Sequence, residues 1–402
     1  MERCAGVDWA KDEHVVCVVD EQGVVVERSR HASDGHGVQG LVEGLVALAV
    51  SQVAIERPDG PVVAALLEAG IVVLPVHPNQ IKAARPRFRS AGKSDAFDAY
   101  VLAELARTDR RRLTPLMPDS DATRALRAAT RARDDLVALR VRLANQLRDQ
   151  LERFWPGAAE IFSEVDSPIA LSFLERYPAP EDAARLDAQR LRAFLARNHY
   201  CGRRAPEELL DRLRRAAQVA VAALECETRR GIVLGLVRAL RPVVEEIARL
   251  TAQIGQALAE HPDGAIFRSL FRDPKSAVTA AQLLAEIGDV RARYPTKEAL
   301  MADAGMCPVA VESGRSRTAV FRWACDKRLR DAVGVLADAS RHHNAWAADL
   351  YTRARARGKD HPHAIRILGR AWLGVIWRLW QDRTTYDPAR HRALQALVGV
   401  GG

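Results

Sequence analysis

Four carboxylate residues stand where they could bind one metal site together. Asp8 and Glu56 each end a short apolar stretch, while Asp95 and Asp98 are three residues apart and would share one face of a helix. Hard oxygen donors of this kind suit Mg²⁺ or Mn²⁺ better than zinc. Two such ions about 4 Å apart can activate a nucleophile and stabilise the leaving oxygen of a phosphodiester. Asp95 taken alone is more often the N-cap of a helix than a metal ligand.

The order of predicted elements explains how these carboxylates could meet. Alternating and continuous apolar runs predict three antiparallel strands, then helix, strand, helix, strand and a final helix, at residues 4–8, 14–20, 24–30, 38–50, 53–56, 61–69, 71–76 and 94–107. This order is typical of a mixed sheet with helices on its faces. In a ribonuclease H-like sheet the first and fourth strands are neighbours, so Asp8 and Glu56 would lie at the same end of adjacent strands.

The rest of the chain is predicted to be mainly helical. Residues 121–154 carry apolar side chains at helical spacing among many charges, and residues 207–258 form a second helical region. Together they predict an antiparallel helical hairpin or coiled coil. Residues from 265 onward alternate helical runs with short polar loops, such as 312–317. We therefore expect three domains, residues 1–118, 119–262 and 263–402.

Composition restricts the class of protein and of partner. The 402 residues are 48% hydrophobic and 28% charged, without a signal sequence or an apolar run long enough to span a membrane, so we expect a soluble, cytoplasmic protein. The six cysteines are scattered, which argues against zinc sites and disulfides. A net charge of +9 and a pI near 9.5 favour a polyanionic partner such as nucleic acid.

A basic loop precedes the last helix of the first domain. Its cationic residues surround Phe88 and are Lys82, Arg85, Arg87, Arg89 and Lys93. A loop of this composition beside a metal site is suited to holding a nucleic-acid backbone. An ordinary solvated surface loop explains the same residues equally well.

The N-terminal motifs resemble those of the DEDD-type insertion-sequence transposases, a family that includes the pilin gene-inverting recombinases. The resemblance lies, in order, in residues 6–11 (GVDWAK), 54–56 (AIE), 76–78 (VHP) and 93–99 (KSDAFDA). It implies an α/β, ribonuclease H-like domain similar to the Holliday-junction resolvase RuvC. It also implies that Asp8, Glu56, Asp95 and Asp98 are the metal ligands.

The C-terminal half carries the second signature of the same family. Residues 283–289 (LLAEIGD), 304–308 (AGMCP) and 312–314 (ESG) resemble it. The resemblance implies that Ser313 is a nucleophile that attaches covalently to DNA, which conserves the energy of the broken phosphodiester for rejoining. Without it, Ser313 and Gly314 would be taken for a tight polar turn. Ser316 is the competing nucleophile, and Arg315 and Arg317 are suited to phosphate contacts.

The sequence therefore predicts a Mg²⁺- or Mn²⁺-dependent bacterial transposase that cleaves and rejoins DNA through Ser313. The metal site, from the same or another subunit, would activate the serine. The family resemblance further implies a dimer or tetramer and, in some members, a guide RNA transcribed from the element. Two alternatives stay open: a hydrolytic junction-resolving nuclease that uses the same carboxylates, and a non-catalytic nucleic-acid-binding protein from a decayed element.

Overall fold

The computed structural model describes residues 2–88, 94–216, 219, 221–313 and 316–398. The chain divides into two compact units, Met1–Pro118 and Asp119–Gly402. The second unit contains both of the segments expected at residues 119–262 and 263–402. Across the described residues, no helix combines the length and the apolar character that a membrane span requires.

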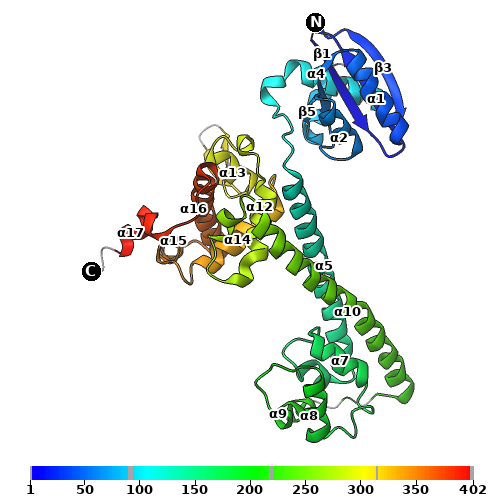
Figure 1. Ribbon diagram of the computed structural model, residues 1–402, viewed down its shortest axis with the longest axis vertical. Coiled ribbons are helices and arrows are strands. Elements are labelled where there is room, and N and C mark those ends of the chain that lie inside the picture. Colours follow the sequence, from blue (N-terminus) through cyan, green and yellow to red (C-terminus); the bar gives the residue numbers. More distant parts are fainter. Residues whose placement is uncertain (1, 89–93, 217–218, 220, 314–315, 399–402) are drawn as a thin grey trace. The chain divides into compact units, whose positions relative to one another are not determined.

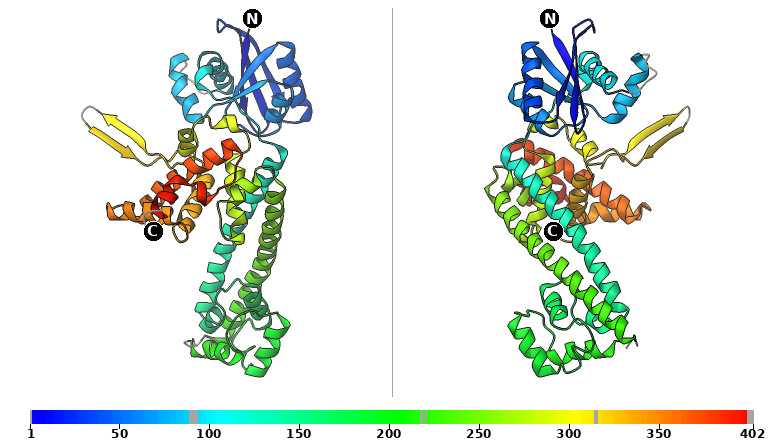
Figure 2. Two further views of the ribbon diagram at one scale, coloured as in Figure 1. Left: turned by 60° about the vertical axis from the view of Figure 1, so that its left-hand side comes forward. Right: turned by 90° about the vertical axis from the view of Figure 1, so that its right-hand side faces the viewer.

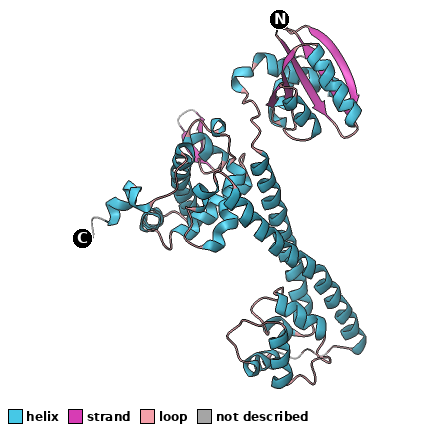
Figure 3. Cartoon of the chain, viewed as in Figure 1, coloured by secondary structure: helices cyan, strands magenta, loops and turns pink. Residues whose placement is uncertain are grey.

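The first unit is an α/β domain around a five-stranded sheet (Figures 1 and 3). The strand order is β3-β2-β1-β4-β5, with β1, β2 and β3 antiparallel and β1, β4 and β5 parallel. Its elements are β1 (Arg3–Trp9), β2 (Glu13–Val19), β3 (Val25–Ala32), α1 (Gly35–Ala47), β4 (Val50–Ile55), α2 (Pro61–Glu68), β5 (Val72–Pro75), α3 (Pro78–Ala84) and α4 (Asp95–Thr108). This topology confirms the predicted ribonuclease H-like class.

Helices cover both faces of this sheet because its central strands are apolar on both sides. Ala5, Val7 and Ile55 pack on the face that α1 and α2 cover. Cys4 and Ala54 belong to the core on the opposite face, where α4 packs. Since side chains alternate along a strand, Asp8 and Glu56 share the face of Cys4 and Ala54.

Gly6 lets α4 approach β1 very closely. A Cβ atom at Gly6 would lie 2.1 Å from the carbonyl oxygen of Ala99 and 2.4 Å from the backbone nitrogen of Ala103. Both are backbone atoms, so a side chain could not be accommodated without moving the helix or the strand. Strand and helix are therefore in direct backbone contact on the face that carries Asp8.

The second unit is almost entirely helical. Its elements are α5 (Asp121–Glu152), α6 (Pro156–Glu160), α7 (Pro168–Arg176), α8 (Ala188–Arg197), α9 (Pro206–Arg215), α10 (Ala223–Glu260), α11 (Gly264–Arg268), α12 (Ala277–Ile287), α13 (Lys297–Asp303), β6 (Val309–Ser313), β7 (Ser316–Val320), α14 (Lys327–Ser340), α15 (Ala345–Ala356), α16 (His361–Asp382) and α17 (Arg392–Val398). The long helices α5 and α10 pack side by side, as predicted for residues 121–154 and part of 207–258 (Figure 2). One apolar core lies at each end of this pair.

A buried network of charges fixes the start of α5 to the end of α12. Asp119, whose side chain is fully buried, accepts hydrogen bonds from Arg127 and Arg293 and from the backbone N–H of Asp289. Gly288 has φ +86°, and a Cβ there would lie 2.3 Å from a carboxylate oxygen of Asp119. Residues 283–289, which carry the family signature, thus hold two helices together.

Asp289 makes this network sensitive to acid. Burial opposes ionisation, but hydrogen bonds from the side chain and backbone of Ser120 and from Thr123 outweigh it and lower the pKa of Asp289 to about 2. Because the pKa is depressed in the folded state, the stabilisation is present above the unfolded-state pKa of about 4 and is lost as the pH falls through 2.

We expect Asp289→Asn to lower the free energy of unfolding at pH 7 by about 2 kcal/mol and to weaken its decline between pH 4 and 2. Chemical denaturation across this pH range measures both effects. In the control Asp211→Asn, the 72% exposed carboxylate is removed, and a change within about 0.5 kcal/mol at pH 7 is expected. Equal losses in the two variants would show that the contacts of Asp289 do not stabilise the fold.

The hairpin of β6 and β7 corrects the expectation of a polar loop at residues 312–317. The two strands pair only with each other among the described residues, with Val309 opposite Val320 and Ser313 opposite Ser316. They extend away from the helices of their unit (yellow in Figure 2). The period-two spacing of Val309 with Val311, and of Thr318 with Val320, was a strand signal that the expectation of a loop overlooked.

Candidate active site

Asp8 and Glu56 lie at the same end of neighbouring strands. Parallel pairing aligns Gly6 with Ala54 and Val7 with Ile55, so the next residues along are Asp8 and Glu56. Asp8 is half-buried and Glu56 is exposed. Because both belong to the α4 side of the sheet, their carboxylates stand at one edge of one face, as the sequence predicted.

The N-terminus of α4 lies at this same edge. Gly6 is in contact with Ala99 and Ala103, whereas the preceding Cys4 is linked further along the helix: Gln52 donates to its sulfur at 3.1 Å and to the carbonyl of Ala106 at 3.3 Å. The helix therefore runs antiparallel to β1. Its first turn, with Asp95 and Asp98, is at the end of the strand where Asp8 stands.

The sequence of α4 favours this placement of acidic residues. Ser94 is the N-cap and accepts a hydrogen bond from the backbone N–H of Phe97. Carboxylates in a first helical turn are stabilised by the positive end of the helix dipole. Asp95 is exposed, while Asp98, three residues later in the same turn, is buried.

Arg85 neutralises Asp98 in this structure. Its Nε and Nη2 atoms donate to the two carboxylate oxygens at 2.7 Å each, and only 8% of the Asp98 side chain is exposed. A bidentate arginine is the strongest common partner of a buried carboxylate. Arg85 lies in the short 3₁₀ helix Arg85–Phe88, directly after α3.

These residues fit a divalent cation by their chemistry and by the edge that they share. Carboxylates that share one sheet edge are oxygen donors of the type that Mg²⁺ and Mn²⁺ select. The residues described do not, however, contain a group of three or more His, Cys, Asp or Glu side chains arranged to hold a metal ion. Ligation by Asp98 would require Arg85 to release it.

Ser313 belongs to the second unit and ends the strand β6. It is exposed, and its register partner is Ser316 at the start of β7. The exposed end of a hairpin makes a hydroxyl group accessible to a large substrate.

The predicted phosphate-binding residues have different surroundings. Lys82 is exposed on α3, whereas Arg85 pairs with Asp98 and Arg87 pairs with Asp109 at 2.9 Å. Arg317 lies in β7 opposite Glu312. Arg89, Lys93 and Arg315 lie outside the described residues. Arg85 and Arg87 thus have intramolecular partners that the sequence did not indicate.

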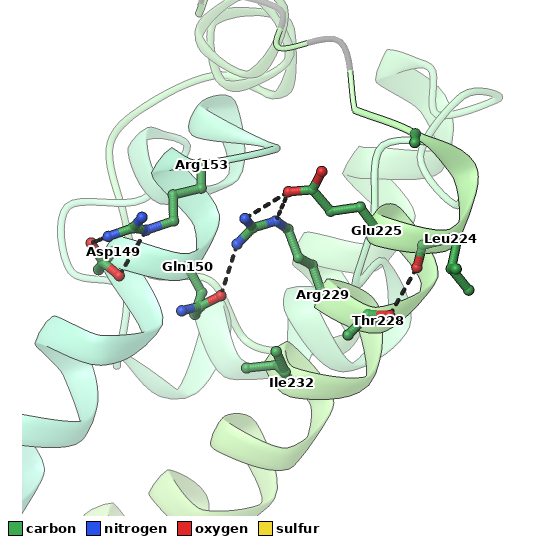
Figure 4. A pocket seen from close by; sticks show the side chains of 9 residues that line it. Asp149, Gln150, Arg153, Leu224, Glu225, Thr228, Arg229 and Ile232 are labelled. Atoms are coloured by element: carbon green, nitrogen blue, oxygen red, sulfur yellow. Dashed lines mark hydrogen bonds and ion pairs between the residues drawn. The ribbon is translucent and has the colours of Figure 1, made fainter.

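A hollow lies elsewhere, between α5 and α10 (Figure 4). It has a volume of about 680 Å³, and its charged residues pair with one another: Asp149 with Arg153 at 2.8 Å and Glu225 with Arg229 at 2.7 Å. Arg229 also donates to Gln150 at 3.1 Å. Because its charges are already paired, this hollow is not a candidate active site.

Comparison with known proteins agrees with the motifs. A family described as a transposase matches residues 5–156, and the transposase IS116/IS110/IS902 family matches residues 276–352. The mini-circle putative transposase for IS117 of Streptomyces coelicolor is 33% identical over 96% of this chain and 95% of its own length. The chain belongs to the IS110 family of transposases.

A second relative also matches almost the whole length. The IS900 uncharacterized 42 kDa protein of Mycobacterium paratuberculosis is 28% identical over 96% of this chain and 97% of its own. Among solved structures, T. thermophilus RuvC in complex with a Holliday junction substrate aligns over 29% of this chain and 100% of its own, with 18% identity and a TM-score of 0.24. The two matched regions of this IS110-family transposase contain the four carboxylates and Ser313, respectively.

Proposed function

We propose that this transposase cleaves and rejoins DNA in a Mg²⁺- or Mn²⁺-dependent reaction, with Ser313 as the covalent nucleophile. The observation that supports it most is the shared edge of Asp8, Glu56, Asp95 and Asp98, at the ends of β1 and β4 and the start of α4. Membership of a transposase family supplies the substrate class. From the family resemblance we also propose that the protein acts as a dimer or tetramer and that a guide RNA takes part.

The four carboxylates would hold the metal, with Asp98 released by Arg85. A bound divalent cation supplies Lewis-acid stabilisation of negative charge on a phosphodiester. Asp8 and Glu56 would orient it from the sheet, and Asp95 and Asp98 from the helix. Lys82 on the adjoining α3 is exposed and would contact the DNA backbone.

Ser313 would perform the exchange of bonds. Its Oγ forms a bond to phosphorus, the bond from phosphorus to one bridging oxygen breaks, and the proton of the serine hydroxyl ends on that leaving oxygen. The product is a phosphoserine link and a free deoxyribose hydroxyl. Attack by a hydroxyl of another strand reverses these changes, which joins the strands and regenerates serine.

We expect Ser313→Ala to abolish a covalent protein–DNA adduct, because the nucleophilic oxygen is removed. The protein is incubated with DNA spanning the ends of its element, Mg²⁺ and RNA from the element's flanks, and adducts are resolved on a denaturing gel. The matched control is Ser316→Ala, which removes the hydroxyl directly opposite in the hairpin register and should retain the adduct.

The pattern of products separates the competing mechanisms. An adduct that survives in Ser313→Ala and disappears in Ser316→Ala would move the nucleophile to Ser316. Free cleaved ends that persist in both variants would indicate that water, and not serine, attacks the phosphodiester.

A further inference from the structure

Aromatic and arginine side chains gather at the foot of the β6–β7 hairpin. Phe321 and Trp323 follow β7, with their rings 4.8 Å apart in an edge-to-face arrangement. The guanidinium carbons of Arg330 on α14 and Arg366 on α16 lie 5.2 and 5.1 Å from the Phe321 ring. These four residues are here called the hairpin-foot cluster.

Trp323 is the unusual member of this cluster. Its side chain is 74% exposed, although an indole normally loses most of its surface to a core or an interface. Phe321 packs edge-to-face against it, and Arg330 and Arg366 lie over the Phe321 ring in turn, so the indole is held on a support and does not stand alone. A supported, exposed aromatic ring can offer its surface to another flat ring.

A hollow of about 620 Å³ adjoins the cluster, between α14 and α16. Phe321, Arg330 and Arg366 line it, together with the apolar side chains of Met306, Val335 and Ile365. Val335 is 54% exposed. This volume is within the range of small-ligand sites, and the combination of apolar surface with a few charged groups is typical of them.

The charges of the site favour an anion. In the described part of the chain, Arg366 forms no ion pair, so its charge is available to a ligand. Two acidic residues also line the hollow, but Asp338 pairs with Arg341 at 2.7 Å and Asp331 lies 4.0 Å from Arg330. A ligand with both a flat aromatic ring and a negative charge matches what the site offers.

We propose that the hairpin-foot cluster and the adjoining hollow bind an unstacked base of single-stranded nucleic acid. Trp323 would stack on the base, while Arg366 would contact the phosphate that follows it. The choice of nucleic acid over a peptide rests on the proposed function and on the two guanidinium groups against Phe321. A strand held here would be next to the hairpin that carries Ser313.

The test compares strands that have the same charge and differ in their bases. Fluorescence anisotropy of the full chain in EDTA measures binding of oligothymidine DNA, oligouridine RNA and an abasic strand, each of about ten residues. Wild-type protein should prefer strands with bases over the abasic strand. Trp323→Ala should weaken binding of the base-containing strand on the order of tenfold and remove that preference.

Two further variants separate the loss of base stacking from the general effect of truncating an exposed apolar side chain. Trp323→Phe keeps an aromatic ring and should retain most of the preference, and Leu224→Ala truncates an 81% exposed apolar side chain on α10 and should bind as wild type. Comparison of the DNA and RNA strands identifies which nucleic acid the site selects. The measurement needs neither metal nor Ser313, so it is independent of the cleavage mechanism.

Two results would overturn the inference. One is an unchanged base preference in Trp323→Ala. The other is a loss of self-association in Trp323→Ala, seen by sedimentation, without any change in base preference, which would make the exposed indole a contact between copies of this chain.

Discussion

Asp8→Asn should reduce metal-dependent strand cleavage on the order of a thousandfold, because several kcal/mol of charge stabilisation by a bound cation depend on this carboxylate. Asparagine has nearly the same shape but carries no charge. Asp8 is the last residue but one of the central strand β1 and shares its face with the first turn of α4, so its charge is central to the proposed site. Cleavage rates of element-end DNA at several Mn²⁺ concentrations, together with calorimetric titration of Mn²⁺, measure the effect.

Glu27→Gln is the matched control for this substitution. It also converts an acid into an amide in the same sheet, but on the exposed edge strand β3. We expect wild-type cleavage and metal binding in this variant. Normal Mn²⁺ binding with normal cleavage in Asp8→Asn would place the metal site elsewhere, whereas normal binding with lost cleavage would assign Asp8 to the reaction and not to the metal.

Gly6→Ala should destabilise the first unit by about 3 kcal/mol or more, because the added Cβ would collide with backbone atoms of α4. The Ala99 carbonyl oxygen, 2.1 Å from that Cβ, cannot rotate away as a flexible side chain would. Either β1 or α4 has to shift, and both carry proposed metal ligands. The loss of stability is measured in the full chain as faster hydrogen exchange of the amides in residues 2–88 and 94–118.

Gly44→Ala is the control, and it should change the stability of the first unit in the opposite direction. Gly44 lies within α1, and a Cβ there meets nothing within 4 Å. Alanine should therefore stabilise the same unit by about 0.5–1 kcal/mol, because it favours the helix. If hydrogen exchange slowed in both glycine variants, the close contact between β1 and α4 would not limit the stability of the first unit.

Most of the element order of the first unit could be predicted because its signals are local, but α3 and the 3₁₀ helix Arg85–Phe88 form where a basic loop was expected. Apolar alternation in β1 to β3 and the polar start of α4 are each contained in a few residues, although the N-cap is Ser94 and not Asp95. The alignment of Asp8 with Glu56 followed from the fold class, and the observed strand pairing agrees with it.

What could not be predicted depends on partners distant in the chain. Asp119 pairs with Arg293, a separation of 174 residues, and no periodic pattern links the two. Arg85 was interpreted as a phosphate contact because its neighbours are basic. In the fold it lies beside α4 and pairs with Asp98. The hairpin-foot cluster likewise combines residues of a loop, α14 and α16.

The pair of Arg85 and Asp98 also bears on how this domain reaches its folded state. A cluster of acids without a cation would repel itself, and many small metal-binding folds form only when the ion is present. Here an arginine of the same domain already occupies the most buried carboxylate. We therefore expect the first unit to fold without the proposed metal, so a chelator should stop cleavage without changing the thermal unfolding of this unit.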